Sequence, residues 1–124
     1  MGDDLEQLQG TWYIVALEIE GAKLVPSAYA GAHIIIDGSR FTSIAMGAKY
    51  SGTIEVDPST DPKTFRMKFL DGPEKGNTNN GIYQLAGDTW QFCLSMTGGP
   101  APTDFVTAPR SGLAMEVLNK EKET

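Results

Sequence analysis

The segment Leu8–Leu17 constrains the fold more strongly than any other part of the chain. It holds the longest apolar run and one of the two tryptophans, and Gly10 stands just before a series of aromatic and β-branched residues. This arrangement is typical of a β-strand that enters a hydrophobic core. We therefore predict a strand from about Thr11 to Ile19, with Trp12 facing the interior.

The composition favours a single all-β domain spanning residues 1–124. A chain of 124 residues is long enough to form one core without a disulfide or a metal. Its 14 glycines and 7 prolines indicate many turns. The single cysteine, Cys93, has no internal partner, and its apolar surroundings predict a buried, small hydrophobic side chain.

Seven further segments have the alternation or the flanking turn residues expected of strands: 33–36, Arg40–Met46, 49–57, 64–69, 80–85, 89–96 and 112–119. The dipeptides Asp37-Gly38 and Gly87-Asp88 are hairpin signals. With the first strand, these segments predict an eight-stranded antiparallel up-and-down barrel, which leaves no exposed sheet edge. Asp3 or Asp4 is expected to begin a short N-terminal helical turn.

The strand directions give the two ends of this barrel different loops. The end that contains Trp12 also receives the connections at 37–38, 57–62 and 87–88, while 21–31, Gly47, 71–78 and 97–111 lie at the other end. Three of the four loops at that other end are long. Because long loops form an adaptable mouth and short turns a closed floor, we expect a binding site at the long-loop end.

Strand alternation also selects the side chains that are expected to point inward: Trp12, Ile14, Phe41, Tyr50, Ile54, Phe65, Met67, Phe69, Trp90, Phe92, Leu94, Met96, Leu113, Met115 and Val117. An eight-stranded barrel has room either for such side chains or for one small ligand. Met67, Met96 and Met115 lie toward the mouth, where flexible thioethers suit an adaptable pocket as well as an irregular core. Both alternatives stay open.

Glu18 is the most suggestive acidic residue. If the first strand keeps its alternation past Ala16, this carboxylate points inward near the mouth, where burial or a cationic ligand would perturb its pKa. A β-bulge would instead turn Glu18 to solvent. The other candidate ligand contacts besides the three methionines are Tyr50, Phe69, Tyr83 and Arg110.

The charge and hydropathy patterns exclude several partners. A formal net charge of −6 and a pI near 4.6 argue against nucleic acid or an anionic membrane, since either requires a basic patch. The apolar runs fall far short of the roughly 20 residues that span a bilayer. Met1-Gly2-Asp3-Asp4 is acidic where a signal peptide has a basic region, so a cytoplasmic location is expected if the chain is complete.

The remaining motifs predict no catalytic residue, metal site or cofactor. The lone His33 in an apolar strand is interpreted as structural rather than as a haem ligand. Asp57 and Asp61 flank a proline turn that is expected to be a turn rather than a calcium site. The glycines of 72–76 lack the helix and the hydroxyl residue of a phosphate loop, which predicts an exposed turn.

Both faces of the first strand are apolar, so its outer face needs a cover. Three candidates are the N-terminal turn, the segment Leu24–Ala30, and a second subunit. The third implies a homodimer formed through this strand.

Gly10-Thr11-Trp12, followed by Tyr13-Ile14-Val15, resembles the G-x-W signature that opens the lipocalins. In that family the tryptophan packs across the closed end of an eight-stranded barrel, which implies structural roles for Gly10 and Trp12. More closely, residues 8–17, 41–42, 72–76, 81–83 and 116–118 resemble an uncharacterised lipocalin-like bacterial domain family that is abundant in planctomycetes.

The chain departs from the lipocalin pattern in two respects. Where lipocalins place an arginine on the tryptophan, it offers Lys120 or Lys122, which stack less well than a guanidinium. It also stops too soon for the helix that covers the first strand in lipocalins, so the N-terminal turn or dimerisation is expected to substitute.

These observations favour the non-enzymatic binding of one small apolar or amphipathic molecule at the long-loop end, under 21–31 and 97–111. The alternative is a solidly packed barrel that acts as a protein-interaction or structural module. A weaker alternative is an enzyme that uses Glu18 or a tyrosine as acid or base.

Overall fold

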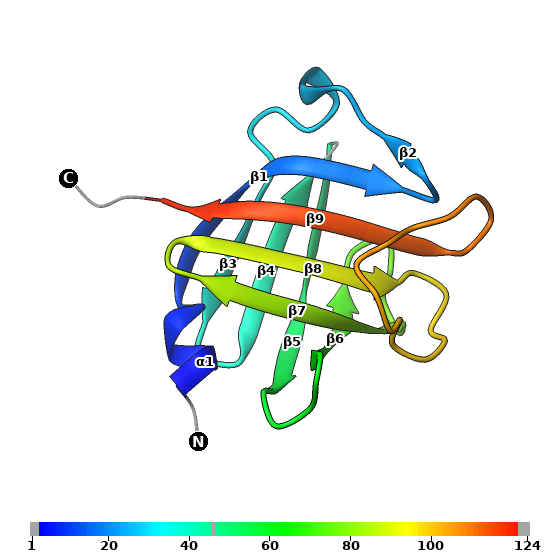
Figure 1. Ribbon diagram of the computed structural model, residues 1–124. Helices are drawn as coiled ribbons and strands as arrows, with labels where there is room; N and C mark the ends of the chain where they lie inside the picture. Colours follow the sequence, from blue (N-terminus) through cyan, green and yellow to red (C-terminus); the bar gives the residue numbers. More distant parts are fainter. Residues whose placement is uncertain (1–2, 46, 122–124) are drawn as a thin grey trace.

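The computed structural model describes residues 3–45 and 47–121 and contains a closed β-barrel (Figure 1). Eight strands form it: β1 (Gly10–Ile19), β3 (His33–Asp37), β4 (Arg40–Ala45), β5 (Ala48–Asp57), β6 (Lys63–Asp71), β7 (Thr78–Ala86), β8 (Thr89–Ser95) and β9 (Leu113–Lys120). Each strand pairs antiparallel with the next, and β9 pairs with β1 to close the sheet. The predicted all-β up-and-down barrel is confirmed. Met46, the predicted end of one strand, lies outside the described residues.

Three short elements accompany the barrel. Helix α1 (Asp3–Gln7) is the predicted N-terminal turn, and it lies beside the end of the barrel where β1 begins (Figure 1). The two-residue strand β2 (Ala22–Lys23) extends the sheet beside the end of β1, and the 3-10 turn η1 (Pro26–Ala28) follows it. These elements place additional chain against the floor and against the outer side of β1.

The floor is built around Trp12. Its indole is fully buried, meets Trp90 edge to face at 5.7 Å between ring centroids, and donates from Nε1 to the Leu8 carbonyl at 2.7 Å. Lys120 Nζ lies 5.6 Å from the centre of the Trp12 ring, the position expected of Lys120 or Lys122. Lys122 itself lies outside the described residues. Gly10 has φ +117°, which favours glycine, and a Cβ there would lie 3.3 Å from Lys120 Cε, so its structural role follows from backbone shape.

A β-bulge in β1 decides which way Glu18 points. Ile14 pairs with Leu118 but Ala16 pairs with Val117, so the register shifts between Ile14 and Ala16. Such an insertion exchanges the two faces of the strand beyond it. Leu17 consequently faces the interior, where it is 7% exposed, and Glu18 faces outward.

Strand β9 has the opposite alternation to the one predicted. Ala114 and Leu118 are buried in the core and Glu116 lines the interior, whereas Met115 and Val117 line a groove on the outside. The prediction that Leu113, Met115 and Val117 point inward is therefore wrong. The prediction failed because the outer face of β9 is also apolar. Met115 and Val117 on that face line an outer groove together with Leu24 and Tyr29.

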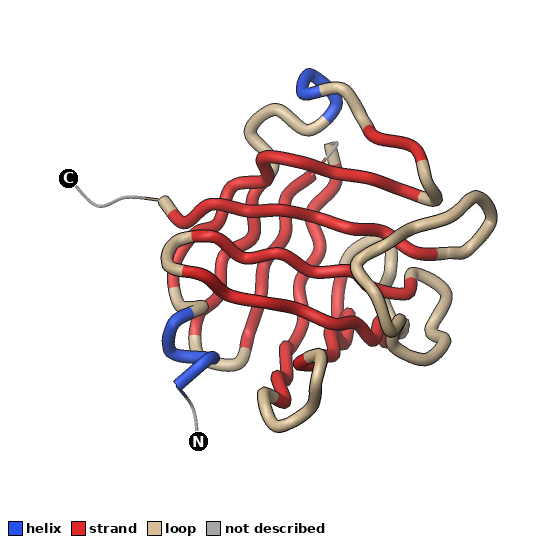
Figure 2. Tube along the Cα trace, in the orientation of Figure 1, coloured by secondary structure: helices blue, strands red, loops and turns tan. Residues whose placement is uncertain are grey.

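The segment Leu24–Ala30, one of the three predicted covers, lies over the outer face of β1. Tyr29 is 8% exposed and donates its hydroxyl proton to the Val15 carbonyl at 3.1 Å. The connection 96–112 also packs against the outside of the barrel. There the buried Cys93 thiol donates a hydrogen bond to the Val106 carbonyl, with 3.9 Å between the sulfur and oxygen atoms. In Figure 2 the segment with the 3-10 turn projects from the outside of the barrel beside β1, and the connection 96–112 lies at the end where β8 ends and β9 begins.

Candidate functional site

A cavity of about 140 Å³ lies inside the barrel, on the mouth side of the aromatic floor. Cavities of roughly 150 Å³ hold one benzene molecule, so this space suits a ligand of about one ring. Its wall is mostly apolar and receives residues from all eight strands of the barrel, among them Leu17, Ile34, Met67, Phe69, Phe92 and Leu94. Below it, Phe65 meets Tyr83, Trp90 and Phe92 edge to face, and this aromatic cluster fills much of the interior on the floor side.

Four of the predicted ligand contacts line this cavity: Tyr50, Met67, Phe69 and Met96. Alternation along β5 and β6 places the first three on the inner face, and Met96 follows the end of β8. Tyr50 and Phe69 meet edge to face at 6.0 Å. Their side chains supply an adaptable apolar wall near the mouth.

Glu116 is the most unusual residue of the cavity wall. It lies in the middle of β9, paired with Phe92 of β8 on one side and with Leu17 of β1 on the other. Its Oε1 atom is buried and has no hydrogen-bond partner. Burial raises the pKa of this carboxyl from 4.5 to about 7, because the apolar surroundings disfavour the charged form.

Asn79 contributes a second unpaired polar atom to the same cavity. It stands opposite Met67 on β7, is 3% exposed, and its Oδ1 atom has no partner. In residues 3–45 and 47–121, only one other buried side-chain polar atom lacks a partner, the Trp90 indole nitrogen in the floor. Two of the three unsatisfied groups thus belong to the cavity wall. Unpaired buried polar groups cost about 1–3 kcal/mol each, and they call for an explanation.

The other predicted contacts lie elsewhere. Tyr83 is buried in the floor, where its hydroxyl donates to Asp4 Oδ2 at 2.7 Å, so the expectation that it reaches the binding cavity is wrong. Burial and the Asp4 contact raise the pKa of Tyr83, while the Tyr83 hydrogen bond and nearby Lys63 lower the pKa of Asp4. These contacts join α1 to the barrel.

Glu18, Met115 and Arg110 also lie outside the cavity. The bulge turns Glu18 to an outer groove, where it accepts a hydrogen bond from the Thr107 hydroxyl. Met115 lines the same groove, because β9 has the reverse alternation. Arg110 is exposed in the loop after β8, with φ +60°. The loops 21–31 and 97–111 likewise contribute no residue to the cavity wall, which receives only Glu74 from the long loops of the mouth.

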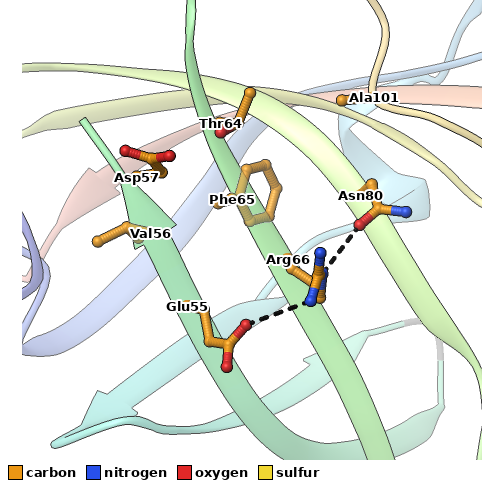
Figure 3. A pocket seen from close by; sticks show the side chains of 8 residues that line it. All are labelled: Glu55, Val56, Asp57, Thr64, Phe65, Arg66, Asn80 and Ala101. Carbon is orange, nitrogen blue, oxygen red and sulfur yellow. Dashed lines mark hydrogen bonds and ion pairs between the residues drawn. The ribbon is translucent and has the colours of Figure 1, made fainter. Parts of the chain in front are cut away.

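A larger groove of about 620 Å³ lies on the outer surface beside β5, β6 and β7 (Figure 3). Its charged and polar groups are already bonded to one another. Arg66 Nη1 lies 3.6 Å from Glu55 Oε1, and Arg66 Nε donates to Asn80 Oδ1 at 3.2 Å. Asn80 Nδ2 in turn donates to the Gly99 carbonyl at 3.0 Å. A ligand in this groove would compete with existing contacts and with water, so the interior cavity is the better candidate.

His33 and Asp57, the other residues considered as ligands from the sequence, bind neighbouring residues of the chain. His33 Nδ1 lies 2.8 Å from the Gly31 carbonyl, and its ring contacts Tyr13. Asp57 accepts hydrogen bonds from the Ser59 amide and hydroxyl, which lowers the pKa of its carboxyl and confirms the predicted turn. Across residues 3–45 and 47–121, no group of three metal-ligating side chains gathers, and no helix in that part of the chain is long and apolar enough to cross a membrane.

Comparisons of the chain with protein-family models, with curated proteins and with solved structures find no match. The geometry of the barrel interior is therefore the main ground on which a function can be argued.

Sequence reasoning missed the two residues that distinguish the cavity, Asn79 and Glu116. Asn79 immediately precedes the predicted strand 80–85, so no side of the sheet was assigned to it. Glu116 alternates with the apolar residues chosen as inward-facing in β9. The signal that could have identified it is the alternation of Ala114, Glu116 and Leu118, which share one face of the strand. On that face the acid lies between two apolar residues.

Proposed function

We propose that this chain is a lipocalin-like binding protein, not an enzyme, that holds one small apolar or amphipathic molecule inside its barrel. The observation that carries the proposal is a one-ring cavity with an apolar wall and two buried oxygens that have no partner. Ligand sites commonly combine such an apolar wall with a few polar groups that fix orientation.

The G-x-W resemblance supports the same function. Eight-stranded barrels of the lipocalin type hold a single small ligand in an interior that side chains only partly fill. Here the aromatic cluster fills the floor side, and the cavity occupies the mouth side. Under this proposal, the ligand contacts the side chains of the four predicted residues that line the cavity, Tyr50, Met67, Phe69 and Met96.

The proposal can be tested by filling the cavity. Ala114 is 5% exposed and lines the cavity, so Ala114→Leu should occupy much of the available volume. Calorimetric titration with neutral one-ring compounds, such as benzyl alcohol and toluene, should show binding to the wild type and none to this variant. Ala86→Leu, on the exposed face at the end of β7, is the matched control and should bind as the wild type does.

Two outcomes would contradict the proposal: no binding of any one-ring compound to the wild type, or equal affinities in the wild type and in Ala114→Leu. Thermal unfolding should verify that each variant is folded. If Ala114→Leu is not, Leu94→Phe fills the same cavity from β8 and replaces it.

A second candidate is the protein-interaction module, with a homodimer through β1 as its simplest form. The observation in its favour is an outer groove of about 330 Å³ lined by Leu24, Met115 and Val117, near Val15, which is 45% exposed. Light scattering distinguishes it: a dimer that Val15→Lys dissociates favours this function, and a monomer at all concentrations removes its support.

A further inference from the structure

Glu116 carries chemical information about the ligand. A carboxyl group at this position is surrounded by Phe92 and Leu17 on the neighbouring strands, with Ala114 and Leu118 next to it on the inner face of β9. Replacing an unpaired buried charge by an apolar side chain of similar volume is commonly neutral or stabilising. The stability of the barrel therefore does not account for an acid at this place.

The charge of the cavity has a single sign. Besides Glu116, its only other carboxylate is Glu74 at the rim, and none of the described residues that line it is a lysine, an arginine or a histidine. Glu74 already accepts a hydrogen bond from Asn77 Nδ2 at 3.2 Å. A ligand carboxylate would meet repulsion and no counter-charge, whereas a ligand cation would meet an unpaired acid.

We infer that the ligand is a small cationic amine, whose ammonium group pairs with Glu116 while its apolar body occupies the cavity. The inference rests on the proposed binding function and names its ligand class. An ammonium group has three donors and no acceptor, which matches the unpaired acceptor Glu116 Oε1. Asn79 Oδ1 is a second unpaired acceptor in the wall of the same cavity. The volume limits the apolar body to about one ring.

Burial of the carboxyl makes the site selective. Binding the amine gives the charged form of Glu116 the counter-ion that the described part of the protein does not provide. A neutral ligand of the same shape would gain only the apolar contacts. A charge-assisted hydrogen bond is worth about 1.5–3 kcal/mol, which corresponds to an affinity difference of at least about tenfold.

Three probes that share one ring separate these contributions: benzylamine, benzyl alcohol and benzoate, each titrated calorimetrically into the full chain at pH 8. We expect benzylamine to bind at least about tenfold more tightly than benzyl alcohol, and benzoate not to bind measurably. In Glu116→Gln the amine and the alcohol should bind about equally. Glu55→Gln, which removes an exposed carboxylate from the outer face of β5, is the matched control and should keep the preference for the amine.

The outcomes distinguish the two proposals. If benzyl alcohol binds but the amine has no advantage, or if the advantage survives in Glu116→Gln, the amine inference is wrong while the binding function stands. If benzoate binds as tightly as the amine, the inference is equally wrong. If none of the three probes binds the wild type, the binding function fails and the inference fails with it.

A carbon-13 titration of the Glu116 carboxyl in the wild type provides a second readout that does not depend on a variant. The strands packed on either side present Phe92 and Leu17 to Glu116, and the other titratable groups of the cavity are Glu74 and Tyr50. Benzylamine should lower the pKa of Glu116 and benzyl alcohol should not. An unchanged pKa with bound benzylamine would show that the ammonium lies elsewhere.

Discussion

The floor of the barrel and the cavity above it use polar side chains in opposite ways. At the floor, the Trp12 indole donates to Leu8, and Tyr83 and Lys63 both bind the Asp4 carboxylate. In the cavity, Asn79 and Glu116 each present a buried oxygen that nothing in the described chain binds. The Trp90 indole nitrogen is the exception at the floor, where it lies among aromatic rings.

This difference separates a structural region from a binding region within one interior. Bonded polar groups fix α1 and the end of β9 against the barrel, so they contribute to folding. Unpaired polar groups reduce stability and become favourable only when a ligand supplies the missing partner. Substitutions on the two sides should therefore have effects of opposite sign on the free energy of unfolding.

The largest effect is expected for Trp12→Ala at the floor. The substitution removes a fully buried indole, its contact with Trp90 and its hydrogen bond to Leu8. We expect a loss of about 3–5 kcal/mol in the free energy of unfolding, measured by denaturant titration with tryptophan fluorescence. Ligand affinity of the fraction that stays folded should be unchanged. A stability equal to that of the wild type would remove the structural role of the G-x-W residues.

Glu116→Gln should act in the opposite direction and depend on pH. Because the pKa of Glu116 is raised from 4.5 to about 7 in the folded state, the wild type should lose stability as the pH rises from 4.5 to 7. Above about pH 7 this loss in the free energy of unfolding stays constant, at about 3 kcal/mol or less. Without ligand, the variant should therefore be more stable than the wild type at pH 8 and about equally stable at pH 4.5.

Denaturant titrations at the two pH values check this prediction, with Glu74→Gln as the control that should keep the pH dependence of the wild type. A Glu116→Gln variant that is less stable at pH 8 would mean that the carboxylate has a partner, and the contrast between floor and cavity would then disappear.

The architecture could be predicted from the sequence because it depends on repeated local signals. Turn residues such as Asp37-Gly38 and the alternation around Phe65 specify where strands begin and which face is buried. The floor followed from Gly10 and Trp12 for the same reason. The end that carries the cavity also followed, since strand directions alone place the long loops there.

The details of the cavity could not be predicted, because they depend on pairing between distant strands. The bulge that turns Glu18 outward is visible only in the register of β1 against β9. The face of β9 that points inward depends on the segment containing Leu24 and Tyr29, which gives Met115 and Val117 an apolar environment outside the barrel. Tyr83 was assigned to the mouth because nothing local shows that Asp4 binds its hydroxyl.

Tyr83→Phe is a smaller change at the floor, the region whose polar groups are hydrogen-bonded. It deletes the hydroxyl that donates to Asp4 Oδ2 and leaves the ring in the aromatic cluster. We expect a loss of about 2 kcal/mol in the free energy of unfolding at neutral pH, as for a hydrogen bond to a charged group. Because the same contact lowers the pKa of Asp4, the effect should be complete above about pH 4 and shrink as the pH falls through the folded-state pKa.

The smallest and most direct comparison uses two consecutive residues of β7. Asn79 points into the cavity with an unpaired oxygen, while Asn80 points outward and bonds Arg66 and Gly99. Asn79→Leu should raise the free energy of unfolding by about 1 kcal/mol, and Asn80→Leu should lower it by about the same amount. Both changes replace one amide of the same strand by leucine, so the change in strand propensity is similar at the two positions. Position 79 loses an unpaired oxygen and gains a buried apolar side chain, whereas position 80 loses hydrogen bonds to Arg66 and Gly99. Denaturant titration of the two variants side by side measures this contrast, and effects of equal sign would contradict it.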